Sequence, residues 1–414
     1  MSKKSIIRKL TLAALAAVGL SACSKAPLAG GYPYPPMMAY GAPRAPLSAM
    51  AAGSGIQTFF VKAYGHSAAE NEQAARRDPQ GPAPQLIRVI DSAQQTLDGS
   101  FYDIDNADVV QALLRARQRG VRIRLTTDTD NLTAKNSGPQ GPPREAIVAL
   151  KQAGIPIVDD KRSGIMHNKF LVIDGQRVWT GSTNLTNTSL FQHNNNALLL
   201  NSPEMAATYS AEFERLFTQK IFGVNPPRQQ IPNRFQIGQA QVEVYFSPRG
   251  GGQQAVLNEL HNARQRIVFM TFSLTDKTAG EIIQQKAARG VKVDGVFDSW
   301  LGASQYSLYS PMRLDGIGVS KDGNEALLHH KVIIVDDTVI TGSYNYSANA
   351  ENSNNENFLI IRNAPAITQA YLDEFARIKQ VSYPGKPRVS APGGVSAQSV
   401  PRAMVAPMPV REED

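Results

Sequence analysis

The chain repeats one order of apolar and polar segments. In residues 101–128, and again in 271–298, a strand-like apolar segment precedes a helix-like segment, and Arg-Gly-Val then leads into a second strand-like segment. Segments 154–160 (GIPIVDD) and 316–322 (GIGVSKD) continue the match. Because strands alternate with helices in both copies, each half is expected to form an α/β/α sandwich. The repeat predicts an α/β protein of two fused halves, related by a pseudo-twofold axis.

Composition marks where the folded part begins and ends. A segment rich in Pro, Ala and Gly precedes it, and a similar one follows; neither can bury a core. The sequence therefore predicts a signal peptide at 1–22, a tether at 23–54, a first half at 55–219, a linker at 220–238, a second half at 239–382 and a disordered tail at 383–414.

The N-terminus has the pattern of a processed leader. A basic stretch at 1–9 precedes an apolar run of 11 residues at 10–20, and LSAC follows at 20–23. This resembles the lipobox of bacterial lipoproteins, in which Cys23 would be lipidated and become the new N-terminus. An ordinary signal peptide is the alternative. Ser24 resembles the sorting preference for the outer membrane, so we expect a lipoprotein of the cell envelope, anchored on the periplasmic side or in the outer membrane.

Charge and cysteine content narrow the picture further. The leader holds four of the 43 Lys and Arg residues, so the mature chain would carry about half of the formal +8. Such a mildly basic chain tolerates phosphate-bearing partners without indicating nucleic acid. Cys23 is the only cysteine, so no internal disulfide can form. No stretch after the leader is apolar for the ~20 residues of a membrane span.

Two short motifs carry the candidate chemistry: MHNKFLVIDG at 166–175 and LHHKVIIVDD at 328–337. Side chains alternate across a strand, so the histidine and lysine of each motif share a face, whereas the aspartate points away and would support the turn. The equivalent residues are His167, Lys169 and Asp174 in the first copy, and His329, Lys331 and Asp336 in the second.

A second polar cluster follows each motif. The first half has TGSTN at 180–184 and the second has TGSYN at 341–345; Asn195 and Glu356 lie fourteen residues past the glycine of each. Histidine can be nucleophile, acid or base, lysine suits phosphate oxygens, and serine and asparagine can donate to an oxyanion. No carboxylate cluster resembles a metal site, so we expect neither metal nor cofactor. One histidine from each half could attack phosphorus and protonate the leaving oxygen, as in a metal-independent phosphodiesterase.

The two H-x-K-x4-D motifs, each followed by G-S-x-N, resemble the duplicated signature of the phospholipase D superfamily. Residues 242–276 also resemble the start of such a domain, and the resemblance covers about 55–382. The family includes phospholipases D, cardiolipin synthases, bacterial endonucleases and tyrosyl-DNA phosphodiesterases. Membership therefore implies the mechanism more firmly than the substrate.

The resemblance implies a role for each matched residue. His167 would be the nucleophile that forms a phosphohistidine, and His329 the acid that protonates the leaving alcohol and then the base that activates water. Glu356 is expected to support His167 across the interface between the halves, while Asn195 can orient a ring but supplies no charge. The residues expected to hold the non-bridging oxygens, or to lie near them, are Lys169, Lys331, Asn184, Asn345, Ser182 and Ser343.

Other polar and aromatic residues are assigned more modest roles. We expect His193 to border the site, His330 to be structural, and His66 and His261 to lie on the surface. The equivalent pair Tyr102 and Phe272 would be core residues that could line the cleft. Trp300 and Tyr306 could cover the site or simply pack.

Three functions remain open from the sequence. The leading one is a membrane-tethered phospholipase D that hydrolyses phospholipid head groups, because an anchor concentrates the enzyme at its substrate; transfer to an alcohol, as in cardiolipin synthesis, is a variant. The second is an envelope-anchored nuclease, for which the basic segment 115–124 could track a nucleic-acid backbone. The third is a scaffold with a dead site, which the intact motifs disfavour. Because both halves supply the site, a monomer is expected to suffice.

Overall fold

The computed structural model describes residues 55–63, 67–135, 137, 140–223 and 231–383. The predicted signal peptide and tether, Cys23, His66 and nearly all of the predicted tail lie outside the described residues. Within them, no helix is long and apolar enough to cross a membrane.

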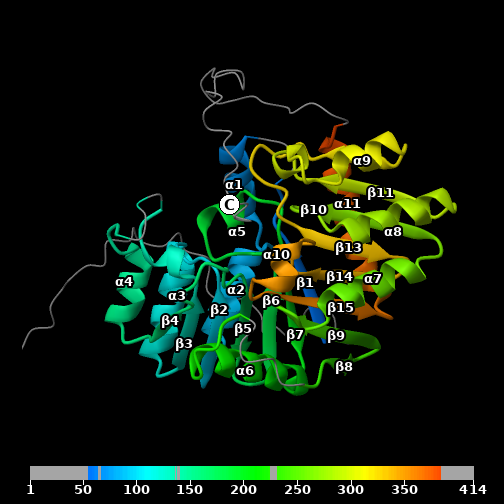
Figure 1. Cartoon of the computed structure of the whole chain (residues 1–414). Helices are drawn as coiled ribbons and strands as arrows, with labels where there is room; N and C mark the ends of the chain where they lie inside the picture. Colours follow the sequence, from blue (N-terminus) through cyan, green and yellow to red (C-terminus); the bar gives the residue numbers. More distant parts are fainter. Residues whose placement is uncertain (1–54, 64–66, 136, 138–139, 224–230, 384–414) are drawn as a thin grey trace, which may run out of the picture. The chain divides into compact units, whose positions relative to one another are not determined.

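The first half builds a mixed sheet of seven strands (Figure 1). The β2, β3 and β4 strands are parallel, and the other pairings are antiparallel. In sheet order the strands are β1 (Ile56–Phe60), β7 (Asn196–Asn201), β6 (Arg177–Gly181), β5 (Lys169–Ile173), β2 (Thr96–Phe101), β3 (Arg122–Thr127) and β4 (Ile157–Asp159).

The second half builds a sheet of eight strands with the same order through its centre. In sheet order the strands are β12 (Gly318–Lys321), β11 (Lys292–Phe297), β10 (Arg266–Thr271), β13 (Lys331–Val335), β14 (Thr338–Gly342), β15 (Asn357–Arg362), β9 (Ala240–Phe246) and β8 (Arg234–Ile237). The edge strand β8 lies inside the range predicted as linker, so the second half begins earlier than its predicted start at 239. Tyr383 pairs with Lys321, although the tail was predicted to start at 383.

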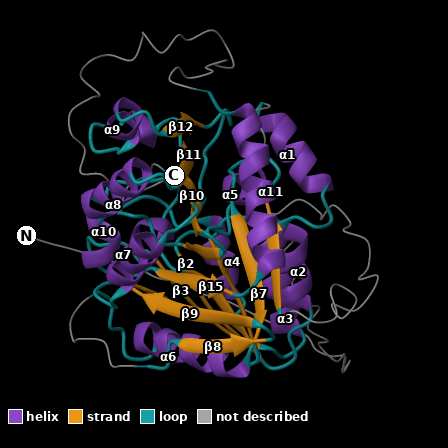
Figure 2. Cartoon of the chain, turned by 90° about the vertical axis from the view of Figure 1, so that its right-hand side faces the viewer, coloured by secondary structure: helices purple, strands orange, loops and turns teal. Residues whose placement is uncertain are grey.

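Helices accompany both sheets, as Figure 2 shows. Both α6 and α11 follow the last central strand of their half, and α11 also packs on β1 of the first sheet. The helices are α1 (Ala68–Arg77), α2 (Pro82–Asp91), α3 (Ala107–Gln118), α4 (Glu145–Gln152), α5 (Asn187–Phe191), α6 (Pro203–Phe217), α7 (Gly252–Asn262), α8 (Lys277–Ala288), α9 (Tyr309–Leu314), α10 (Ala348–Asn352) and α11 (Pro365–Val381), with short 3₁₀ turns at Thr129–Leu132 and Leu301–Ala303.

The repeated Arg-Gly-Val ends the same helix in each half. Side chains of Asn106 and Asp276 cap the N-termini of α3 and α8. After these helices, Gly120 and Gly290 both adopt φ of 90°, a left-handed conformation that glycine accepts without a Cβ clash. The match seen in the sequence is therefore a match of helix start, helix end and following strand.

One hydrophobic core joins the two halves. It combines buried residues of the first sheet and α6, such as Phe170 and Tyr209, with residues of the second sheet and α11, such as Val332 and Tyr371. A second core cluster lies within the second half alone. The predicted pair of fused α/β halves is confirmed, and the shared core fixes the two halves against each other.

Candidate active site

Backbone pairing across the halves positions both motif histidines. The amide of His167 donates to the Asn355 carbonyl at 2.9 Å, and the amide of His329 donates to the Asn194 carbonyl at 3.0 Å. Each asparagine amide donates back to the segment just before the same histidine. The start of each motif is thus held by a loop of the other half, and the site exists only where the halves meet.

The His167 ring contacts a carboxylate from the second half. Its Nδ1 lies 2.7 Å from Glu356 Oε2, and both side chains are buried. The contact expected across the interface is present. Because the two ring nitrogens lie on opposite sides of the imidazole, a proton held on Nδ1 leaves the Nε2 lone pair directed away from Glu356.

The His329 ring has an amide at the equivalent place. Its Nδ1 lies 2.8 Å from Asn195 Oδ1, which comes from the first half. The Asn195 Nδ2 donates to the Ser189 carbonyl at 2.9 Å, so the amide oxygen faces the ring. Both histidines are therefore oriented from the opposite half, one by a carboxylate and the other by a neutral acceptor.

The serines of the two G-S-x-N clusters support these acceptors. Ser182 Oγ donates to Asn195 Oδ1, and Ser343 Oγ donates to Glu356 Oε2, each at 2.7 Å. The same hydroxyl oxygens accept from backbone amides. The single hydroxyl protons of Ser182 and Ser343 are thus directed to the groups that orient the histidines, and their place near the substrate phosphate stays a prediction.

The two lysines are buried beside the histidines. Lys169 Nζ donates to the His167 carbonyl at 2.9 Å, and Lys331 Nζ donates to the His329 carbonyl at 3.0 Å. Two positive charges are thereby held within a small, water-poor volume, where they act strongly on any anion.

Aromatic rings line the same space. The Tyr102 ring lies 5.3 Å from the His167 ring, and the Phe272 ring lies 4.9 Å from the His329 ring. Both aromatic residues are buried. Lysine ammonium groups lie over the two rings as well, at 5.3 Å and 4.7 Å from their centroids. Tyr102 and Phe272 are therefore both core residues and residues that border the site, as the sequence allowed.

The remaining predicted residues fall into two groups. Asn184 and Asn345 are buried just after β6 and β14, close in sequence to the serines that support the rings. Asp174 accepts from the amides of residues 94–96, and Asp336 from those of residues 264–266. Both aspartates adopt positive φ at the turn after the motif strand. The two carboxylates hold the starts of the neighbouring strands β2 and β10. Their side chains do not face the histidines, in agreement with the alternation of side chains along the motif strand.

Burial and nearby cations keep both rings neutral. Burial, together with Lys169 and Lys331, holds the pKa of His167 well below its ordinary value. Burial also holds the pKa of His329 well below its ordinary value, with further contributions from Lys331 and His193. In the absence of an anion, each imidazole therefore carries one proton at neutral pH.

Two buried aspartates were missed in the sequence. Asp128 accepts from the Met166 amide at 2.9 Å and Asp298 from the Leu328 amide at 3.0 Å, so each holds the residue just before a motif histidine. Burial, with Asp160 nearby, raises the pKa of Asp128 to about 7, and burial raises the pKa of Asp298 to about 6. The signal was available, because these aspartates end the two matched segments 101–128 and 271–298.

The other histidines and aromatic residues differ in burial. His330 is buried, with Nδ1 2.9 Å from Asn196 Nδ2 and Nε2 3.3 Å from Glu374 Oε1, in agreement with a structural role. His261 is exposed, as predicted. Trp300 and Tyr306 are 59% and 57% exposed, so they are not packed core residues.

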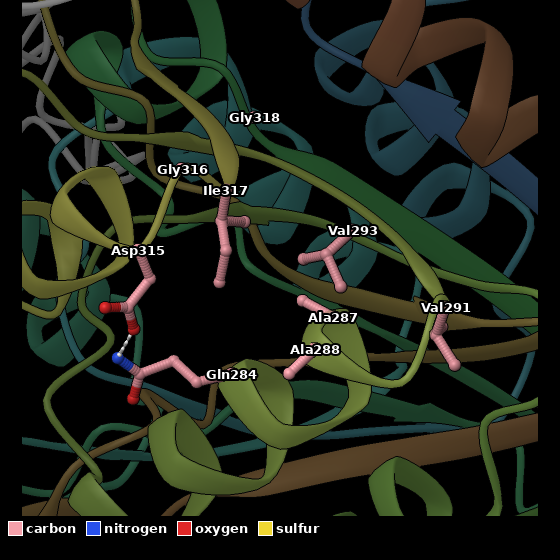
Figure 3. A pocket seen from close by; sticks show the side chains of 9 residues that line it. All are labelled: Gln284, Ala287, Ala288, Val291, Val293, Asp315, Gly316, Ile317 and Gly318. Atoms are coloured by element: carbon pink, nitrogen blue, oxygen red, sulfur yellow. Dashed lines mark hydrogen bonds between the residues drawn. The ribbon is translucent and has the colours of Figure 1, made fainter.

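A cavity of about 340 Å³ lies apart from this chemistry (Figure 3). It opens between α8 and the turn before β12, and the side chains of Gln284 and Asp315 close one side with a hydrogen bond. None of its lining residues belongs to the two motifs, and we assign it no role. Among the residues that the structure describes, no group of three or more His, Cys, Asp and Glu side chains could hold a metal ion.

Two pseudo-equivalent half-sites, each built from histidine, lysine and asparagine and each completed by the other half, define a phospholipase D-like protein. Residues 86–217 and 256–379 match the family described as cardiolipin synthase, PLD-like domain. These segments make up more than half of the chain, and the chain belongs to this family.

Individual relatives agree with this assignment. A mitochondrial cardiolipin hydrolase of Chlamydomonas reinhardtii is 33% identical over 135 residues, which are 32% of this chain and 57% of the relative. A phospholipase D of Rickettsia conorii is 31% identical over 131 residues, or 32% of this chain and 62% of the relative. The chain thus spans about three fifths of the length of the curated relatives it matches.

A solved structure supports the fold over a larger part of the chain. The phosphatidylserine synthase of Haemophilus influenzae is 14% identical and superimposes with a TM-score of 0.57, covering 79% of this chain and 87% of that one. At this level of identity the likeness concerns the fold alone.

Proposed function

We propose that the chain is a metal-independent phosphodiesterase of the phospholipase D type, which works through a phosphohistidine. One observation carries the proposal: two motif histidines are oriented from opposite halves through Nδ1, beside two buried lysines. This arrangement provides a nucleophile, an acid and a cationic cradle for a phosphate without further groups.

The difference between Glu356 and Asn195 assigns the two histidine roles. A histidine that attacks phosphorus becomes positively charged, and a carboxylate on its Nδ1–H stabilises that charge. His167 has this partner. A protonated histidine that must release its proton is a stronger acid beside a neutral acceptor, and His329 has the Asn195 amide. His167 is therefore the nucleophile and His329 the acid.

The reaction follows in two steps. With the anionic diester bound, His329 carries a second proton, on Nε2. The Nε2 lone pair of His167 forms a bond to phosphorus, the bond to the leaving oxygen breaks, and that oxygen takes this proton from His329. In the second step His329 accepts a proton from water, the resulting hydroxide attacks phosphorus, and the bond to His167 breaks. A phosphomonoester is released, and both histidines return to their starting states.

The remaining residues supply charge and position. Lys169, Lys331, Asn184 and Asn345 hold the non-bridging oxygens, whose negative charge grows in the transition state. Ser182, Ser343, Asp174 and Asp336 act through the groups that they orient. Because the lysines provide the positive charge, the proposed reaction needs no metal ion and should persist in EDTA.

The proposed substrate is a phospholipid, cleaved at its head group. The description of the family, and the names of the relatives in Chlamydomonas and Rickettsia, refer to cardiolipin or to phospholipase D. Transfer of the phosphatidyl group to an alcohol instead of water is a variant of the second step. The ratio of transfer to hydrolysis depends on whether an alcohol or water reaches the phosphohistidine.

The nuclease alternative has less support. The basic segment 115–124 was its candidate groove, but most of its arginines are engaged in ion pairs. Arg115 and Arg119 pair with Asp91, while Arg122 and Arg124 pair with Asp98. These pairs reduce the positive charge that the segment can offer to a nucleic-acid backbone.

The test is head-group release from mixed phospholipid vesicles in the presence of EDTA. The mature chain and its His167→Ala variant are compared, with folding of both checked by circular dichroism. Release by the unmodified chain alone supports the proposal. If no lipid is cleaved but single-stranded DNA or RNA is, the substrate is nucleic acid. If the variant is as active as the unmodified chain, the whole site assignment is wrong.

We further propose that the protein is a lipoprotein of the cell envelope that acts as a monomer. The support lies in the leader pattern around Cys23 and in the two half-sites within one chain. Cys23→Ala should abolish labelling by a fatty-acid analogue and release the protein from the membrane fraction. Labelling that survives this substitution would contradict the anchor.

A further inference from the structure

The two half-sites differ at the position two residues before the group that orients each histidine. In the second half this residue is Asn354, which is buried with Nδ2 3.5 Å from Glu356 Oε1. In the first half it is His193, which is also buried. The His193 ring lies 5.8 Å from the His329 ring, with the two planes tilted by 50°. The site therefore contains a third histidine, and it stands beside only one of the other two.

His193 is held firmly in this place. Its amide donates to the Thr188 carbonyl at 2.9 Å. The following residue, Asn194, pairs with the backbone before His329, and its side-chain oxygen accepts from Asn324 at 2.8 Å. Asn324 also donates to the carbonyl of Gln192 at 3.0 Å. His193 thus sits between residues that are fastened to the second half, so its backbone is fixed relative to the segment that carries His329.

We propose that His193 controls the proton on His329 and is a positioning residue for the acid and base steps. The inference rests on the proposed function, in which His329 protonates the leaving oxygen. Two imidazolium rings at this separation repel each other, so a proton on His193 makes His329 a stronger acid. Among the residues that the structure describes, the equivalent place beside His167 is taken by Asn354 and not by a histidine, and His167 must accept positive charge rather than release a proton.

Several other charged groups surround the pair and act on both rings. Within the site they are two lysines and the titratable ring of His167. Beneath the motif they are buried carboxylates, and on the α1 side they form an ion pair that reaches the loop through Gln192. These groups are Lys169, Lys331 and His167; Asp298 and Asp322; Glu72 and Arg76; and Glu325 in the loop before the second motif. Replacing His193 alone leaves all of them in place.

The first test compares pH profiles of the unmodified chain, His193→Asn and His261→Asn. Asparagine is the residue that the second half has at this position, and His261 is an exposed histidine outside the site. The profiles are those of kcat/KM for a phosphodiester with an alkyl leaving group. The alkaline limb of His193→Asn should move to higher pH, by on the order of one pH unit, because loss of a positive neighbour raises the pKa of His329. His261→Asn should match the unmodified chain.

The leaving group provides a second readout. A p-nitrophenyl ester departs without needing a proton, so His193→Asn should alter its first step far less than that of the alkyl ester. An equal effect on both esters would overturn the proposal, because a general loss of structure would act on both. An unchanged alkaline limb would overturn it too.

Nitrogen NMR of labelled histidines tests the coupling between His193 and His329 without any substrate. In the unmodified chain the His329 ring should titrate at lower pH than in His193→Asn, with assignment from His329→Asn. If no ester is cleaved, the proposed function fails, and the NMR titration still tests the coupling. Identical His329 titrations in both proteins would show that the coupling does not exist.

Discussion

At the scale of single residues, the atom that accepts from Nδ1 distinguishes two otherwise equivalent histidines. Glu356→Gln replaces the carboxylate beside His167 with an amide of the same shape. Phosphoenzyme formation should then slow by about 10²- to 10⁴-fold, because the charge that develops on the ring loses its partner. Rapid-quench measurement of the first turnover checks this. Glu243→Gln, a carboxylate of the same half that pairs with Arg362, is the control. A variant Glu356→Gln as fast as the unmodified chain would refute the role of Glu356.

The neutral state of both histidines predicts how anion binding depends on pH. Because the pKa values of His167 and His329 are held well below their ordinary value, binding of an anion must raise at least one of them. A ligand that raises a pKa binds more tightly at low pH. Dimethyl phosphate, which keeps one charge, should therefore bind more weakly as pH rises from about 6 to about 8, by up to about tenfold per unit. Calorimetric titration measures this, and affinity that does not change with pH would contradict it.

At the scale of elements, buried aspartates connect each motif to the loop after a neighbouring strand. Asp298 accepts from the amides of Trp300, Leu301 and Leu328. Asp298→Ala leaves these amides without their acceptor and should lower the free energy of unfolding by on the order of 3 kcal/mol. Denaturant titration measures this loss. Asp337→Ala is the control: its carboxylate is 87% exposed and pairs with Arg266, so the change should stay within about 0.5 kcal/mol.

The free energy of unfolding that is lost in Asp298→Ala should depend on pH. Burial raises the pKa of Asp298 from its ordinary value of 3.8 to about 6. The part of its contribution to stability that depends on protonation is therefore full below about pH 4 and is lost as pH rises through about 6. The stability difference between the unmodified chain and Asp298→Ala should accordingly narrow over this range. A difference that widens with pH would show that the carboxyl is stabilised in its charged form.

The sequence predicted the central elements well and the peripheral ones poorly. The buried strands β5 and β13 produce unbroken apolar runs, and period-2 parity correctly turned Asp174 and Asp336 away from the histidines. The edge strand β8 was taken as linker, because its alternation of polar and apolar residues covers only four positions between proline and glycine, which is too short to indicate a strand. The hydrogen bonds from Ser182 and Ser343 to Asn195 and Glu356 were not predicted, since residue type cannot tell whether a hydroxyl faces a substrate or a neighbouring side chain.

At the scale of the whole molecule, the shared core and the crossed contacts make the halves interdependent. Asn357 Nδ2 donates to Thr180 Oγ1 at 2.7 Å, and Thr341 Oγ1 donates to Asn196 Oδ1 at 3.0 Å, so buried polar groups of each half are satisfied by the other. Removing one half would expose both these groups and the core. The folded part should therefore unfold in a single cooperative transition.

Scanning calorimetry tests this cooperativity. The calorimetric enthalpy should equal the van't Hoff enthalpy, and activity should be lost in the same transition. Two separate transitions would show that each half is stable by itself, and the account of a shared core would then be wrong.

The most direct test of the central claim is to trap the covalent intermediate. In His329→Asn, incubated in EDTA with bis(p-nitrophenyl) phosphate, the first step needs no acid, and the second step lacks its base. Mass spectrometry should then find a phosphoryl adduct on the peptide that contains His167, and none in a chain that also carries His167→Asn. Turnover without any adduct, or an adduct on another residue, would contradict the assignment of His167 as the nucleophile.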